Sequence, residues 1–113
     1  MASVKIDLRE ALTSPSSRVL SGRDRGNECR KRFGLDRLDK NPDDIVVTIP
    51  NDIYSLNTSF FLGLFGKSVR DLTKEGFLRK YRFEGDEVHL TTVTEGIDRA
   101  LKESTIFSDK EPA

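Results

Sequence analysis

The sequence predicts an α/β fold in which helices pack on a mixed, mostly parallel sheet of about four strands. Two observations lead to this fold class: β-branched or alternating apolar segments recur along the chain, and amphipathic helical segments separate them. Strands that are joined by helices run parallel with right-handed connections. The 113 residues suit one domain over 1–113, and we expect its last residues, 106–113, to form a frayed tail.

Two strands and one helix are predicted in the first half of the chain. Apolar and charged residues alternate over 4–8, and all residues of 45–49 are β-branched, so both segments indicate strands. Residues 21–33 predict a helix with Ser21 as its N-cap and Gly34 just past its end. Two segments rich in serine, proline or aspartate are expected to form a turn and a loop: 13–17 and 39–44.

The segment LNTSFFLGLFGKSVR places three polar residues before a dense apolar run and predicts a helix over 57–73. Asn57 is the expected N-cap, because its side chain can accept a hydrogen bond from a backbone N–H two or three residues on. Gly63 and Gly66 each disfavour a helix by about 1 kcal/mol relative to alanine. We therefore expect the helix backbone to approach a sheet closely there. The apolar face consists of Phe61, Leu64, Phe65, Val69 and Leu72.

The last third of the chain predicts a strand followed by a helix. Residues 74–76 are expected to close the preceding helix, 77–83 to form a strand, and 84–86 to form a turn. Residues 87–92 fit either a strand or a helix capped by Asp86, and both remain open. Beyond them a capping-box pattern and an apolar stripe indicate a helix. The residues of these two patterns are Thr92 and Glu95, and Val93, Ile97 and Leu101.

Composition narrows the classes of function. Lysine plus arginine equals aspartate plus glutamate at 19 each, so a generic binder of nucleic acid or anionic membranes is disfavoured. No apolar run approaches the ~20 residues of a membrane span and no signal peptide is evident, so we expect a cytoplasmic protein without membrane attachment. A single cysteine, Cys29, excludes an internal disulfide and a multi-cysteine zinc site. We expect it to be a half-buried structural thiol.

The residues also favour a non-enzymatic protein without cofactor or metal. The one histidine, His89, has no serine or cysteine nucleophile motif near it. The acidic residues Asp43, Asp44 and Asp52 are typical of a loop. Segment 21–26, SGRDRG, matches neither phosphate-binding glycine motif. A hydrolase or transferase that uses His89 remains an alternative.

Basic residues concentrate before the central predicted strand. An anion-binding or nucleic-acid-binding accessory protein is therefore an alternative function, with Arg23, Arg25 and Arg30 as its candidate binding residues. Acidic residues interrupt this segment, however, and pairing between residues four apart explains it equally well. A nucleic-acid partner is disfavoured for this reason.

Two parts of the sequence resemble a known family. The run SFFLGLFGKSVR at 59–70 is similar to the SFL…FG…VR signature of the STAS-like domain of unknown function. Segment 21–26, followed by Glu28 and Arg30, resembles the Arg/Gly-bearing segment before that family's first helix. The resemblance covers about residues 18–84 and implies a two-layer STAS-like fold.

The resemblance also implies a site and a partner. In STAS domains of sulfate transporters and anti-sigma-factor antagonists, a strand enters an Asp-Ser-Ser-Gly turn at a helix N-terminus, and a partner kinase phosphorylates the first serine. That turn falls on Asn57, Thr58, Ser59 and Phe60, with Thr58 at the phosphoacceptor position. A regulatory module that docks an ATP-binding, histidine-kinase-type protein is thereby implied. The residues alone leave open that Asn57, Thr58 and Ser59 only cap the helix.

Overall fold

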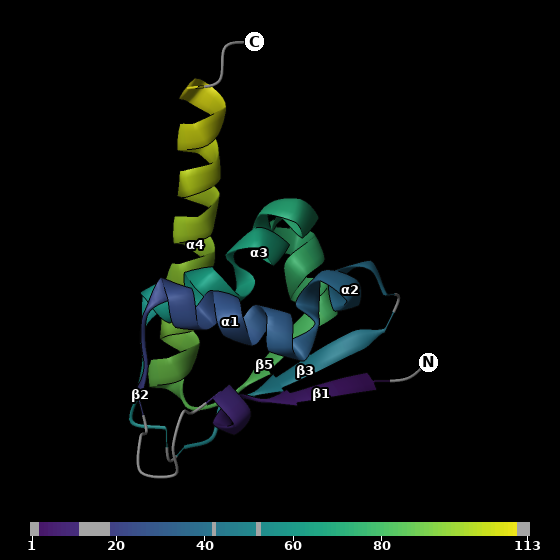
Figure 1. Ribbon diagram of the computed structural model, residues 1–113, viewed down its shortest axis with the longest axis vertical. Helices are drawn as coiled ribbons and strands as arrows, with labels where there is room; N and C mark the ends of the chain where they lie inside the picture. Colours follow the sequence, from purple (N-terminus) through teal and green to yellow (C-terminus); the bar gives the residue numbers. More distant parts are fainter. Residues whose placement is uncertain (1–2, 12–18, 42, 52, 111–113) are drawn as a thin grey trace.

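The computed structural model describes residues 3–11, 19–41, 43–51 and 53–110 and contains helices packed on a parallel sheet (Figure 1). The α/β class is therefore confirmed. Along the chain the elements are β1 (Ser3–Asp7), a 3-10 turn η1 (Leu8–Ala11), β2 (Val19–Leu20), α1 (Arg23–Phe33), α2 (Leu35–Lys40), β3 (Asp44–Thr48), β4 (Ser55–Leu56), α3 (Thr58–Lys80), β5 (Tyr81–Glu84) and α4 (Glu87–Lys110).

The main sheet has three parallel strands in the order β1-β3-β5, not about four. Ile45 of the central strand lies opposite Val4 on one side and Tyr81 on the other. Its β-branched run suits this position, and Ile45 and Val47 are fully buried. The remaining strands, β2 and β4, pair in parallel as a separate two-stranded sheet.

The region around α1 and α2 differs from the prediction in two places. Gly22, not Ser21, occupies the N-cap of α1 with a φ of 93°, a conformation that favours glycine. Gly34 ends α1 in the left-handed conformation as predicted, but α2 follows at once and takes the first two residues of the predicted loop 39–44. The short α2 forms because Leu35 and Leu38 are both buried on one face.

Helix α3 is longer than predicted and is kinked where the prediction ended. Thr73 has a φ of 67° and a ψ of 169°, and a second helical segment continues to Lys80. Residues 74–76 therefore do not close the helix, and the strand begins at Tyr81 instead of 77. The polar side chains after the kink lie on the exposed face of this segment, while Phe77 is fully buried.

Helix α4 begins at Glu87, which settles the alternative for 87–92 in favour of a helix. The Asp86 carboxylate accepts a hydrogen bond from the His89 backbone N–H, as expected of an N-cap. The capping box at Thr92 is wrong, since its hydroxyl donates to the Val88 carbonyl within the helix. The predicted turn at 13–17 falls outside the described residues; of the predicted frayed tail at 106–113, residues 106–110 belong to α4 and 111–113 fall outside the described residues.

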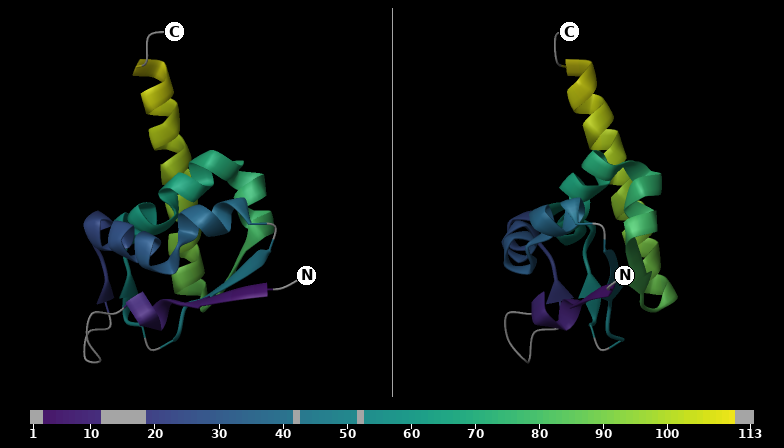
Figure 2. Two further views of the ribbon diagram at one scale, coloured as in Figure 1. Left: turned by 45° about the vertical axis from the view of Figure 1, so that its right-hand side comes forward. Right: turned by 90° about the vertical axis from the view of Figure 1, so that its right-hand side faces the viewer.

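Close contact between α1 and α3 explains one predicted feature in an unexpected way. Gly63 faces Gly26 of α1, and a Cβ atom at Gly63 would lie 2.1 Å from the Arg23 carbonyl oxygen. Gly63 therefore allows α3 to approach helix α1 closely, and not the sheet as the sequence predicts. Figure 2 shows α1 and α3 side by side in both views, with the C-terminal half of α4 extending beyond them. None of the described helices is long and apolar enough to span a membrane.

Candidate functional site

The N-terminal end of α3 follows directly from β4. Asn57 has an extended backbone, and its N–H donates to the Leu20 carbonyl of β2 at 2.8 Å. Its side-chain Oδ1 accepts a hydrogen bond from the Ser59 N–H at 2.7 Å. The predicted N-cap is therefore confirmed, and the two-stranded β2–β4 sheet fixes where the helix begins.

The hydroxyl groups of Thr58 and Ser59 take no part in this cap. Within the described residues, neither hydroxyl makes a hydrogen bond. Ser59 is exposed and Thr58 is half-buried. The fold thus uses Asn57 for capping and leaves two hydroxyl groups available at the surface.

Thr58 also borders an open hollow of about 380 Å³ beside α4. The other lining side chains are two acidic residues, Glu95 and Asp98, and two basic residues, Arg99 and Lys102. A surface with both signs of charge around a helix N-terminus suits recognition of a polar partner surface.

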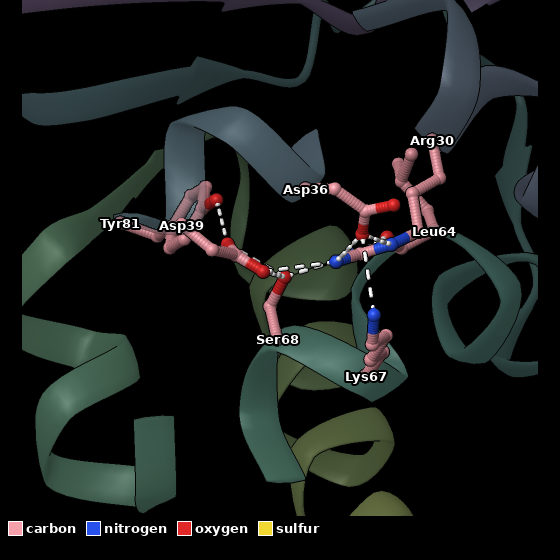
Figure 3. Close-up of polar contacts among 7 residues, drawn as sticks. All are labelled: Arg30, Asp36, Asp39, Leu64, Lys67, Ser68 and Tyr81. Atoms are coloured by element: carbon pink, nitrogen blue, oxygen red, sulfur yellow. Dashed lines mark hydrogen bonds and ion pairs between the residues drawn. The ribbon is translucent and has the colours of Figure 1, made fainter. Parts of the chain in front are cut away.

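Arg30, one of the predicted anion-binding residues, is instead buried inside the protein (Figure 3). Its guanidinium donates to the carboxylates of Asp36 and Asp39 at 2.7 and 2.9 Å. It also donates to the Ser68 hydroxyl at 2.8 Å and to the Leu64 carbonyl at 3.0 Å. Because Arg30 is neutralised by two acids, it is not free to bind an external anion.

The same network extends to β5 through Asp39. Ser68 donates to the Asp39 carboxylate at 2.7 Å, and the Tyr81 hydroxyl donates to it from the other side. Burial, followed by the neighbouring Asp39 carboxylate, raises the pKa of Tyr81. Hydrogen bonding to Arg30 lowers the pKa of the exposed Asp36. In the described part every buried polar side-chain atom has a hydrogen-bond partner, so the network is a structural clamp between α1, α2, α3 and β5.

The three candidate arginines are not brought to one site. The Arg23 guanidinium donates through Nη2 to both carboxylate oxygens of Glu103 in α4, at 3.2 and 2.9 Å. Arg25 lies in a hollow at the start of α1 that Asp24 and Glu28 also line. Acidic side chains therefore accompany each of these arginines.

The other residues that the sequence offers for chemistry are His89, Cys29 and the acidic loop residues. The His89 ring is buried, with Nε2 2.9 Å from the Ile53 carbonyl oxygen. Cys29 is fully buried, not half-buried, and burial raises its thiol pKa, which disfavours the reactive thiolate. Asp44 is exposed at the start of β3, and Asp52 lies outside the described residues. Among the residues with described positions, no three His, Cys, Asp or Glu side chains are grouped to hold a metal ion.

Comparisons of the chain with family models, curated proteins and solved structures found no match. The STAS-like resemblance therefore rests on the motif residues in 18–84 alone.

The Tyr81 hydroxyl predicts a specific loss of stability at alkaline pH. An unfolded tyrosine ionises near pH ~10, whereas the folded chain holds the proton of Tyr81 to higher pH. The unfolded state therefore loses its proton first, and the free energy of unfolding falls as pH rises above ~10. Urea unfolding from about pH 8 to about pH 12 checks this against Tyr81→Phe, whose curve should fall less steeply. Parallel curves for both proteins would contradict the prediction.

Proposed function

We propose that the chain is a non-enzymatic regulatory module of STAS-like fold that docks a protein partner through the N-terminal end of α3. The observation that supports this function is the division of roles at residues 57–59. Asn57 alone caps the helix, while the hydroxyl groups of Thr58 and Ser59 have no hydrogen-bond partner among the described residues. A partner can therefore engage them without breaking a contact of the fold.

Phosphorylation of Thr58 or Ser59 would suit this end of the helix. The first backbone N–H groups of α3 give it a partial positive charge, which stabilises a phosphate. A phosphate adds close to two negative charges at neutral pH. Beside the mixed charges of α4, this addition would repel Glu95 and Asp98 and attract Arg99 and Lys102. The modification would thus change the charge pattern that a partner meets.

The class of partner follows from the resemblance. An Asn-Thr-Ser sequence at a strand-to-helix turn corresponds to the position where STAS domains of the anti-sigma-factor antagonist type meet an ATP-binding protein kinase. A partner of the histidine-kinase ATPase type is therefore proposed by fold-level analogy.

Replacing Thr58 with aspartate is expected to weaken partner binding while leaving the fold intact. A negative side chain in the first turn of a helix stabilises it by about 0.3–1 kcal/mol, so the thermal midpoint should stay the same or rise slightly. The matched control is Thr58→Asn, which removes the hydroxyl without adding charge. Circular dichroism measures fold and midpoint, and cross-linking measures contact with the partner.

For the cross-linking, a photoreactive benzoylphenylalanine is placed at Ser59 in cells that naturally express the chain. A second chain carries it at Arg79, which is exposed on the far segment of α3. The proposal expects a discrete cross-linked protein from Ser59 that Thr58→Asp removes, and none of that mass from Arg79. Equal products from both positions, or products unaffected by Thr58→Asp, would overturn it.

A further inference from the structure

A second surface lies between the segment of α3 after Thr73, β5 and the first half of α4. Figure 2 shows these elements beside one another. They enclose an open groove of about 350 Å³, which shares no lining residue with the hollow at Thr58. We infer that this groove binds a short segment of a partner protein that combines apolar and acidic side chains.

The floor of the groove is continuous with the hydrophobic core. Val93 and Ile97 of α4 line it and are only 4% and 2% exposed. Leu90 and Phe83, both half-buried, complete the floor. The Phe83 ring belongs to the aromatic cluster, with its centroid 5.8 Å from that of Phe77. Such a floor accepts apolar side chains, since burying them there removes apolar surface from water on both partners.

The mouth of the groove is cationic. Lys74 and Arg82 are its charged lining residues. The Arg82 side chain is exposed and makes no ion pair or hydrogen bond with another described residue. Lys74 lies 3.7 Å from Asp98, in a pair whose two side chains are each 53% exposed, so solvent screens this contact strongly. Because the whole chain is neutral, the charge at the mouth is a local feature that favours an acidic partner.

The wall of the groove depends on a strained residue. The backbone of Thr73, with φ 67° and ψ 169°, lies in a region used almost solely by glycine and costs about 1–3 kcal/mol. The kink at this residue redirects the segment that carries Lys74 and Leu78 to the groove. Leu78 is 44% exposed there, which leaves a large apolar side chain for a partner to cover. Strain and an exposed leucine thus occur together at this groove.

The edge of β5 favours a peptide over a small anionic molecule. The main-chain carbonyl of Glu84 accepts a hydrogen bond from the Ile49 N–H at 2.7 Å, and Glu84 lies in register with Thr48 of β3. The main chain of Glu84 therefore faces β3. Main-chain groups of successive strand residues face opposite sides, so the N–H and C=O of Phe83 face away from β3. They offer an extended peptide the main-chain hydrogen bonds used when a strand is added to a sheet edge.

The partner segment can be sought with a phage-displayed library of short random peptides, selected on the intact chain. The groove predicts that the selected peptides combine acidic and apolar residues. Their affinity, measured by fluorescence anisotropy, should fall roughly tenfold or more with Arg82→Glu, because like charges then meet at the mouth. The matched control Arg79→Glu makes the same charge change on an exposed side chain outside the groove and should leave affinity within about twofold.

Each other outcome decides against the groove. Selected peptides without acidic and apolar bias, equal losses with Arg82→Glu and Arg79→Glu, or a library that yields no binder would overturn the inference. Binding of octanoate at the groove, seen by NMR while the library yields no groove binder, would assign it to a small anionic amphipath instead. Peptides that lose affinity with Thr58→Asp but not with Arg82→Glu would overturn the groove and support the surface at α3. The two proposals therefore fail separately.

Discussion

Replacing Gly63 with alanine is expected to destabilise the chain by about 3 kcal/mol or more, at the upper end of overpacking effects. The added methyl group would lie 2.1 Å from the Arg23 carbonyl oxygen and 2.9 Å from the Asn27 nitrogen, both in the α1 backbone. Backbone atoms cannot rotate away as a side chain does, so the two helices would have to separate. Gly26 is equally constrained from the opposite helix, since a Cβ there would lie 2.3 Å from the Phe60 carbonyl oxygen.

Gly66→Ala is the matched control, because it changes another glycine of the same helix. Its Cβ would meet the end of the flexible, exposed Arg70 side chain at 3.3 Å. The gain in helix propensity, about 1 kcal/mol, should therefore dominate and raise the free energy of unfolding. Urea denaturation of both variants measures the two effects. Similar changes for Gly63→Ala and Gly66→Ala would contradict the close contact between α1 and α3.

Features that depend on neighbouring residues could be predicted from the sequence. The end of α1 at Gly34 and the cap of α3 at Asn57 both follow from local backbone chemistry. The parallel sheet follows from alternating strand and helix segments. For the two helix ends, the determining residues lie within a few positions of the feature.

Features decided by distant contacts could not be predicted. The sequence indicated that 74–76 end a helix, yet burial of Phe77 from a continuing helical segment overrides that local signal. Gly63 signalled a close approach, but only the fold shows that Gly26 lies across from it. A glycine in the sequence indicates a close backbone contact, but it does not distinguish a contact with a sheet from a contact with a helix.

The same limit applies to the candidate sites. The exposed end of α3 was visible in the sequence because Asn57, Thr58 and Ser59 are adjacent. The sequence groups Arg30 with its neighbours as a candidate anion ligand, while its partner Ser68 lies 38 residues away. A serine at a buried position of a helix was a signal for such a network, though not for the identity of its partner. The groove likewise combines residues of three elements and has no motif.

Phe65→Ala is expected to lower the free energy of unfolding by about 3–5 kcal/mol, the usual cost of removing a core phenylalanine. Phe65 is 1% exposed and occupies the centre of an aromatic cluster. The centroids of four rings lie 5.3–5.7 Å from its own: those of Phe61, Phe77, Tyr81 and Phe83. These rings come from α3 and β5, so the cavity would weaken the contact between helix and sheet.

Phe65→Leu separates the loss of volume from the loss of ring contacts. Leucine fills most of the space, so the cavity cost largely disappears and the loss of the aromatic contacts remains. Urea unfolding should therefore place Phe65→Leu between the unmodified chain and Phe65→Ala. A nearly neutral Phe65→Ala would mean that this face of α3 does not lie against β5. The kinked segment from Lys74 to Lys80 would then lose the support that holds it beside the groove, because Phe77 packs directly against the Phe65 ring.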